Sequence, residues 1–250
     1  HLSFKIEKGK IYGFLGPNGA GKSTTMNMIT GYIASTEGTV TIDGHDILDE
    51  PEQAKKCIGY LPEIPPLYME MTVREYLEFA AELKGIKKDK RESQIEEVIR
   101  LAKLRDVENR LIQNLSKGYK QRVGLAQAIL GFPEIIILDE PTAVLTPQET
   151  DELFAVIRRV VRELGMTVII ITHKLYEVMA ISDRVGVMRK GRLIGVENTC
   201  DVDEKKLASM MVGRPVLYDR LEKAGEAGAE QIRVSGLTVC DDRGLVAVDG

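Results

Sequence analysis

The residues best suited to chemistry lie in the run "GPNGAGKS" at 16–23, where three glycines precede a lysine and a serine. This spacing, GxxxxGK[ST], is typical of a loop that binds phosphate. Glycines let several backbone N–H groups turn toward phosphate oxygens, and the start of a following helix adds a partial positive charge. The run therefore predicts a triphosphate site, with Lys22 on the β- and γ-phosphates and Ser23 on Mg²⁺. The residues expected to hold ATP here are Gly16, Pro17, Asn18, Gly19, Ala20, Gly21, Lys22, Ser23 and Thr24.

A second pair of chemical groups, Asp139 and Glu140, directly follows the apolar run "IIIL". A phosphate loop needs a further carboxylate for its metal, and we expect Asp139 to hold Mg²⁺ through water. Glu140 is expected to orient or deprotonate the attacking water. Without the phosphate loop, an Asp-Glu pair after a strand would be read as a solvated loop end.

The strands that must position these groups are apolar and short. The runs "EIIILDEP" and "MTVIIITH" are continuous and rich in β-branched residues, which is typical of parallel strands buried on both faces. Helical patterns flank them, including one that begins near Pro147. These alternations predict an α/β fold, a P-loop core of mostly parallel strands with an antiparallel β subdomain and a helical insertion.

Shorter patterns predict further elements. Leu2, Phe4 and Ile6 alternate with polar residues before Gly9, which predicts a first strand and a turn into a buried second strand. The run "GTVTIDGHDI" predicts a short strand and a tight Asp-Gly turn. Residues 22–30 predict a helix that ends at Gly31.

The chain is expected to divide into a nucleotide-binding domain at 1–214, a polar linker at 215–230 and a strand pair at 231–250. A mostly helical insertion is expected at about 64–115. Its first helix should begin after an N-cap at Thr72 and stop at Gly85, a second amphipathic helix should follow it, and a third helix should begin near Ser116.

The overall composition excludes several classes of protein. The net charge of −4 over 250 residues argues against a protein that coats nucleic acid, so no nucleic-acid partner is expected. Three scattered cysteines form no disulfide or metal pattern, which fits a reducing cytosol. No apolar run approaches the roughly 20 residues that span a bilayer, so any membrane role is expected to be peripheral.

The run "NLSKGYKQRVGLAQAIL" at 114–130 resembles the ATP-binding cassette family, the ATPase subunits of ABC transporters. The resemblance covers nearly the whole chain. "LSKGYKQR" is similar to the family's signature and lies between the phosphate loop and Asp139 in the family's order. In the family, two cassettes pack head to tail, and each ATP lies between one phosphate loop and the other chain's signature. The resemblance implies that Ser116 and Gly118 complete a partner's ATP site.

Two further positions gain a role from this resemblance. "IGYLPE" resembles the segment that ends in the family's glutamine near the γ-phosphate and Mg²⁺, and that position is Glu63 here. "IIITHKLYEV" places His173 where the family's switch histidine contacts the γ-phosphate. Glu63 and His173 are therefore expected to position water and phosphate beside Glu140, and Glu63 is also a candidate ligand of Mg²⁺.

The chain departs from the family pattern at several positions. Glu63 stands in place of the usual glutamine, Lys117 and Tyr119 alter the signature, and Thr146 stands where many members carry an aspartate. These substitutions put turnover and coupling across the dimer in question, although not the binding of nucleotide.

The two halves of the chain resemble different members of the family. Residues 1–140 resemble export-type ATPases, and residues 141–250 resemble ATPases of sugar or nucleoside importers. A chimera is one hypothesis and a fragment of a tandem cassette protein is another, since the chain opens with His1 rather than Met. The strand pair at 231–250 would then begin a second cassette, or fold back to complete the first one as in a circular permutation.

The family resemblance implies a MgATP-driven motor of a transporter. Its expected partners are membrane-spanning subunits and a second cassette, with the chain on the cytoplasmic face of the cell membrane. Two alternatives remain open from the sequence: a soluble cassette ATPase with no membrane partner, and a module that binds ATP with little turnover.

Overall fold

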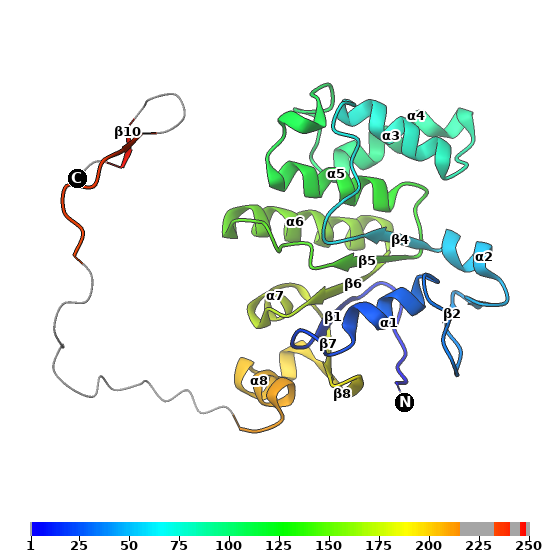
Figure 1. Cartoon of the computed structure of the whole chain (residues 1–250). Coiled ribbons are helices and arrows are strands. Elements are labelled where there is room, and N and C mark those ends of the chain that lie inside the picture. The colour runs from blue at the N-terminus through cyan, green and yellow to red at the C-terminus, as the bar shows by residue number, and fades with distance from the viewer. Residues whose placement is uncertain (1, 216–232, 241–245, 249–250) are drawn as a thin grey trace. The chain divides into compact units, whose positions relative to one another are not determined.

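The computed structural model describes residues 2–215, 233–240 and 246–248. The chain divides into two compact units, at 1–216 and at 217–250, which are considered separately. The first unit contains the phosphate loop and every predicted site residue. Figure 1 shows its helices and strands.

A six-stranded sheet forms the centre of the first unit, in the order β4-β5-β6-β1-β7-β8. Neighbouring strands from β4 to β7 are parallel, and only the edge strand β8 runs antiparallel to β7. The strands are β1 (Ile11–Leu15), β4 (Ile58–Leu61), β5 (Ile135–Asp139), β6 (Thr167–Thr172), β7 (Arg184–Arg189) and β8 (Arg192–Asn198). The mostly parallel α/β sheet predicted from the apolar runs is confirmed.

Both faces of the central strands are buried, as their continuous apolar sequences require. In β5, Ile136 and Leu138 pack on one face with the helices of the insertion, while Ile137 packs on the other face with α1. β6 alternates in the same way, so that Ile170 shares a face with Leu138, its register partner. Side chains of a parallel strand point alternately to the two faces, and here each face has its own cover.

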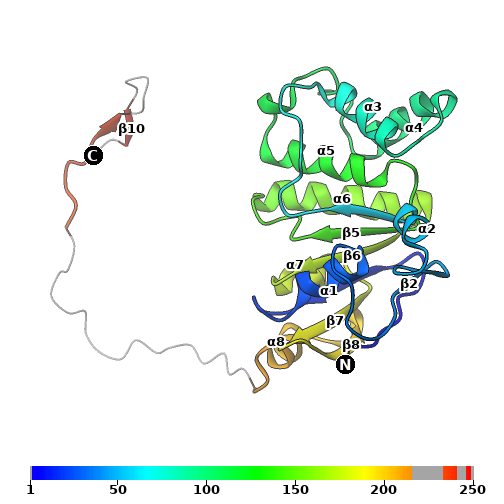
Figure 2. The same ribbon diagram turned by 45° about the vertical axis from the view of Figure 1, so that its right-hand side comes forward.

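The helices of the first unit surround this sheet. Figures 1 and 2 show α3 and α4 together, with α5 beneath them and α6 below α5. The helices are α1 (Lys22–Ile29), α2 (Pro51–Lys56), α3 (Val73–Leu83), α4 (Lys88–Leu101), α5 (Lys117–Ile129), α6 (Pro147–Leu164), α7 (Leu175–Ile181) and α8 (Glu204–Val212), with 3₁₀ turns η1 (Ile112–Asn114) and η2 (Thr199–Asp201).

Local sequence signals set the ends of these helices. Thr72 caps α3 and forms a capping box with Glu75, as its position in the sequence predicts. Thr146 and Glu149 form the same arrangement at the start of α6. Ser116 caps α5 by accepting a hydrogen bond from the backbone N–H of Tyr119. The predicted starts of α3 and α5 are therefore confirmed.

The predicted first strand is wrong. Leu2, Phe4 and Ile6 are partly buried against the core that contains Phe14, and the rings of Phe4 and Phe14 lie 4.9 Å apart. These residues nevertheless form no strand. Alternation shows that one side of an extended segment is buried, but a strand also needs backbone hydrogen bonds to a neighbour, and no described strand supplies them.

The antiparallel elements are small. β2 (Thr41–Ile42) and β3 (His45–Asp46) form a hairpin whose turn is Asp43-Gly44, and both turn residues have positive φ, as the Asp-Gly signal predicts. In the second unit, β9 (Val239–Cys240) pairs antiparallel with β10 (Val246–Val248). Apart from Pro215, the predicted linker at 215–230 lies outside the described residues.

No helix in the described part of the chain is both long and apolar enough to cross a membrane.

Candidate functional site

The phosphate loop connects β1 to α1 at the carboxyl end of the sheet. Gly21 caps α1 with φ of 96°, in the left-handed region that favours glycine. The first N–H groups of α1 have no partner within the helix and are available to an anion. The ammonium of Lys22 is buried and donates hydrogen bonds to the carbonyls of Gly16 (2.7 Å) and Pro17 (3.2 Å).

A pocket of about 300 Å³ opens over this loop. It brings together the loop, the end of β4 and the end of β5. Gly16 and Pro17 do not line it, and their carbonyls accept the hydrogen bonds of the Lys22 ammonium. Its lining residues are Asn18, Gly19, Ala20, Gly21, Lys22, Ser23, Thr24, Glu63, Asp139 and Glu140.

Three acidic residues, Glu63, Asp139 and Glu140, line this pocket. Burial raises the pKa of Asp139, and the neighbouring charges of Glu140 and Glu63 raise it further, against the opposing effect of Lys22. Burial lowers the pKa of Lys22, while the carboxylates of Glu140 and Asp139 act in the other direction. The lining of the pocket therefore places the ammonium of Lys22 among three carboxylates. A bound divalent cation would reduce the repulsion between these carboxylates.

Tyr60 was not predicted as a site residue. It lies in β4 beside Asp139, and burial together with that carboxylate raises the pKa of Tyr60 to about 12. The phenol therefore remains protonated at neutral pH. A polar tyrosine within the otherwise apolar strand "IGYL" was the available sequence signal.

Glu140 and His173 lie in direct contact, an arrangement that the sequence analysis did not predict. Oε1 of Glu140 is 2.8 Å from Nδ1 of His173. Glu140 adopts a positive φ of 44°, which is uncommon for a residue with a side chain and is frequent at functional sites. Its second oxygen, Oε2, is buried and has no hydrogen-bond partner among the described residues.

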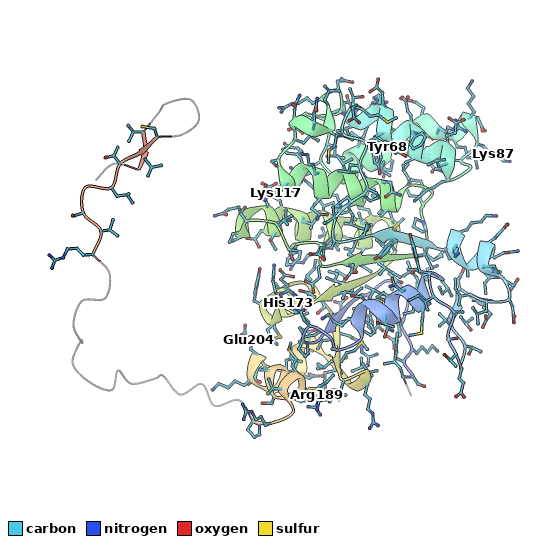
Figure 3. All side chains as sticks on the ribbon, in the orientation of Figure 1. Tyr68, Lys87, Lys117, His173, Arg189 and Glu204 are labelled. Atoms are coloured by element: carbon cyan, nitrogen blue, oxygen red, sulfur yellow. The ribbon has the colours of Figure 1, made fainter. Side chains whose placement is uncertain are left out.

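Ser116 and Gly118 do not line the pocket. They lie at the start of α5, where Oε1 of Glu149 accepts hydrogen bonds from Oγ of Ser116 (3.3 Å) and from the N–H of Gly118 (3.2 Å). Figure 3 shows Lys117, between them, on the same edge of the molecule as His173. The predicted anion site thus already holds an anion, a carboxylate of the same chain.

Glu177 is a second residue that was not predicted. Its carboxylate is fully buried beside the ends of β5 and β6, where it accepts hydrogen bonds from Thr142 and Thr172. The sequence signal was a glutamate on the apolar face of α7, next to Val178 and close to Ile181, both of which are buried.

Oxygen donors suited to Mg²⁺ are present in the pocket. Ser23 and Asp139 both line it, and the pKa of Asp139 is raised, first by burial and then by the neighbouring carboxylates of Glu140 and Glu63. The described residues contain no cluster of three His, Cys, Asp or Glu side chains that could hold a metal unaided. This donor set fits Mg²⁺, which takes one or two protein ligands and completes its shell with phosphate and water.

Comparison with known proteins agrees with this geometry. Residues 1–143 match the family model described as ABC transporter. Among curated proteins, the chain is 40% identical to the uncharacterised ABC transporter ATP-binding protein YhcH of Bacillus subtilis, over 86% of this chain and 70% of that protein. It is 34% identical to the nucleoside import ATP-binding protein NupA of Lactococcus lactis, over the whole of this chain and 50% of that protein.

The fold agrees as well. The structure of CbiO1 from Clostridium perfringens, described as part of the ABC transporter complex CbiONQ, has a TM-score of 0.76 and 28% identity over 84% of this chain and 85% of that one. The segment that matches the family model, residues 1–143, includes the phosphate loop and the Asp139-Glu140 pair. The chain therefore belongs to the ABC transporter family, as an ATP-binding and ATP-hydrolysing subunit.

Proposed function

We propose that this chain hydrolyses MgATP through Glu140 and so drives a membrane transporter. The observation that carries the proposal is the unpartnered Oε2 of Glu140 at the floor of the pocket. A buried carboxylate oxygen normally has a partner, so this one is suited to accept a proton from a water molecule. Its other oxygen is held by His173, which fixes the direction of the carboxylate.

The remaining side chains bind and orient. The helix start and Lys22 hold the phosphates, and Lys22 would exchange its contacts with loop carbonyls for contacts with phosphate oxygens. Ser23 and Asp139 are the residues that would hold Mg²⁺, with Glu63 at the rim of the same pocket. Bound Mg²⁺ would supply charge neutralisation of the phosphates. Catalysis of this kind depends mainly on positioning and electrostatics.

A second cassette is part of the proposal. Ser116 and Gly118 lie outside the pocket of their own chain, yet they form an anion site at a helix start. A head-to-tail pair would bring this site to the nucleotide of the other chain. The contact between these donors and the carboxylate of Glu149 supports their capacity to bind an oxyanion.

The membrane-spanning partners are proposed from the family. The description of CbiO1 as part of a transporter complex supports a similar assembly for this chain, on the cytoplasmic face of the membrane, where ATP is available. The name of NupA supports nucleoside import as one candidate process, beside the export indicated by residues 1–140.

Phosphate release from MgATP tests the proposed chemistry. The wild-type chain should release phosphate, Lys22→Ala should lose ATP binding, and Glu140→Gln should retain binding while turnover falls by about 10²-fold or more. Glu204→Gln, an exposed glutamate on α8, is the matched control and should behave as wild type. ATP binding without phosphate release by the wild-type chain would instead support a binding module.

A further inference from the structure

The carboxylate of Glu177 is the most completely buried charged group of the first unit, with no exposed surface. Its Oε1 accepts hydrogen bonds from Oγ1 of Thr142 (2.5 Å) and from the hydroxyl of Tyr176 (3.1 Å). Its Oε2 accepts one from Oγ1 of Thr172 (2.9 Å). The ammonium of Lys174 lies 2.9 Å from Oε1. Both oxygens are thus fully partnered, and the charge has a counterion.

The two threonines connect Glu177 to the predicted catalytic pair. Thr142 follows Glu140 by two positions, and Thr172 directly precedes His173. The two segments leave the ends of adjacent parallel strands, β5 and β6. They are joined by the backbone bond from the N–H of Glu140 to the carbonyl of Ile171 (2.9 Å), and Glu177 adds a bridge between their side chains.

The network fixes the direction of each hydrogen bond. Oγ1 of Thr172 accepts from the N–H of Lys174 (3.1 Å), so its own hydrogen is available to Glu177. The ammonium of Lys174 also donates to the carbonyl of Thr142 (3.1 Å), which ties the same segment a second time. Each hydroxyl around the carboxylate thus donates to Glu177, and the Lys174 ammonium is shared between Glu177 and Thr142.

Burying an ion pair in a protein core costs desolvation free energy. An apolar residue of similar volume commonly stabilises a fold as well or better, because it avoids the desolvation of two charges. Glu177 lies on the buried face of α7, next to Val178. Its value therefore lies in the geometry that it imposes on the two segments it joins.

We propose that Glu177 is a positioning residue that holds Glu140 and His173 in contact through Thr142 and Thr172. Glu177 itself does not line the pocket. The proposal rests on the proposed role of Glu140 in hydrolysis. Shifts of about 1 Å at a catalytic group can cost about 10²-fold in rate, so loss of this bridge acts on turnover.

Kinetics of Glu177→Ala and Glu177→Gln test the proposal. Glu177→Ala should lower kcat by about 10- to 100-fold, while KM for ATP stays within about 2-fold because the phosphate loop is untouched. Glu177→Gln retains one acceptor oxygen and should lose less. Thr142→Val and Thr172→Val each remove one of the threonine hydrogen bonds to Glu177. Both should lower kcat while KM for ATP stays nearly unchanged. Glu204→Gln serves as the control. Wild-type kcat in a folded Glu177→Gln and Thr172→Val would overturn the proposal.

A structural readout separates this proposal from the proposed function. The chain contains 3 histidines, so the ring signals of His173 can be assigned in an NMR spectrum by comparison with His173→Gln. Glu177→Gln should shift these ring signals in the nucleotide-free protein, as Glu140→Gln should, whether or not the chain hydrolyses ATP. Unchanged His173 signals in Glu177→Gln would overturn the positioning role. Failure of the wild-type chain to hydrolyse ATP would contradict the proposed function alone.

Discussion

Replacement of Glu149 by alanine should have opposite effects on the free chain and on its ATP-bound dimer. In the free chain, Oε2 of Glu149 accepts from the N–H (3.1 Å) and hydroxyl (3.3 Å) of Thr146, and Oε1 accepts from Ser116 and Gly118. These contacts lower the pKa of Glu149, the backbone bond from Thr146 most of all. Glu75 forms the same capping box with Thr72 but does not contact the start of α5, so Glu75→Ala is a matched control.

The magnitude follows from the number of contacts. Either substitution removes the glutamate side of a capping box, while the threonine still accepts from the backbone N–H at the third helical position. Glu149→Ala also removes two hydrogen bonds at a partly exposed site, worth about 0.5–1 kcal/mol each. Glu149→Ala should therefore cost about 1–2 kcal/mol more than Glu75→Ala, a further drop of about 2–8 °C in Tm for a chain of this size. Because the pKa of Glu149 is lowered, this stabilisation is present above its ordinary pKa of 4.5 and is lost at lower pH.

In the dimer, the same substitution should be favourable. Ser116 and Gly118 must release Glu149 before they can bind the partner's nucleotide, so removal of the carboxylate should tighten the ATP-dependent dimer by about 3- to 10-fold. Sedimentation of Glu140→Gln with and without Glu149→Ala measures this difference. Equal stabilities of Glu149→Ala and Glu75→Ala, together with an unchanged dimer affinity, would refute the reasoning.

Three other substitutions have expected outcomes. Gly16→Ala places Cβ 2.5 Å from the carbonyl oxygen of Met188 in β7, so ATP affinity should fall at least about 10-fold by titration, with about 1–3 kcal/mol lost in chemical unfolding. Asp139→Asn removes a buried carboxylate whose pKa is raised by burial, so Tm of the nucleotide-free chain should rise while Mg²⁺-dependent turnover falls. In the wild type, the raised pKa of Asp139 means that the free energy of unfolding increases as pH falls toward the ordinary pKa range of aspartate. Lys84→Ala removes three hydrogen bonds to carbonyls at the end of α5 (2.7–3.1 Å), so Tm should drop by about 2–8 °C in a thermal melt with ATP affinity unchanged.

Features fixed by local sequence could be predicted. The phosphate loop depends on a spacing within eight residues, and the structure forms it between β1 and α1. The strands β5 and β6 depend on continuous apolar runs, and both lie in the centre of the parallel sheet. The caps at Thr72 and Ser116 depend on residues no more than three positions away.

Features that depend on distant partners could not be predicted. Glu177 meets Thr142 across 35 positions, and Glu149 meets Gly118 across 31. No spacing rule connects such pairs. The first contact arises when parallel strands bring their carboxyl ends to one edge of the sheet, and the second arises when the starts of α5 and α6 meet. The prediction of a strand at Leu2–Ile6 was wrong for the same reason. Its alternation indicates burial on one side, whereas a strand requires a neighbouring strand elsewhere in the chain.

The contact between Glu140 and His173 depends both on local sequence and on the pairing of distant strands. Each residue was identified by its position after a buried strand and by the family resemblance, and their 2.8 Å separation follows from the pairing of β5 with β6. The roles of these residues remain predictions until turnover is measured. The family, by contrast, rests on matched sequence and fold over most of the chain.

The solution mass of Glu140→Gln, with and without MgATP, tests the central claim most directly. Removal of the proposed base should trap ATP, and Ser116 and Gly118 of each chain should then close on the nucleotide of the other. The account predicts a monomer without nucleotide and a dimer with MgATP. A chain that binds MgATP and stays monomeric would contradict it, because the phosphate site would then work without the partner's signature.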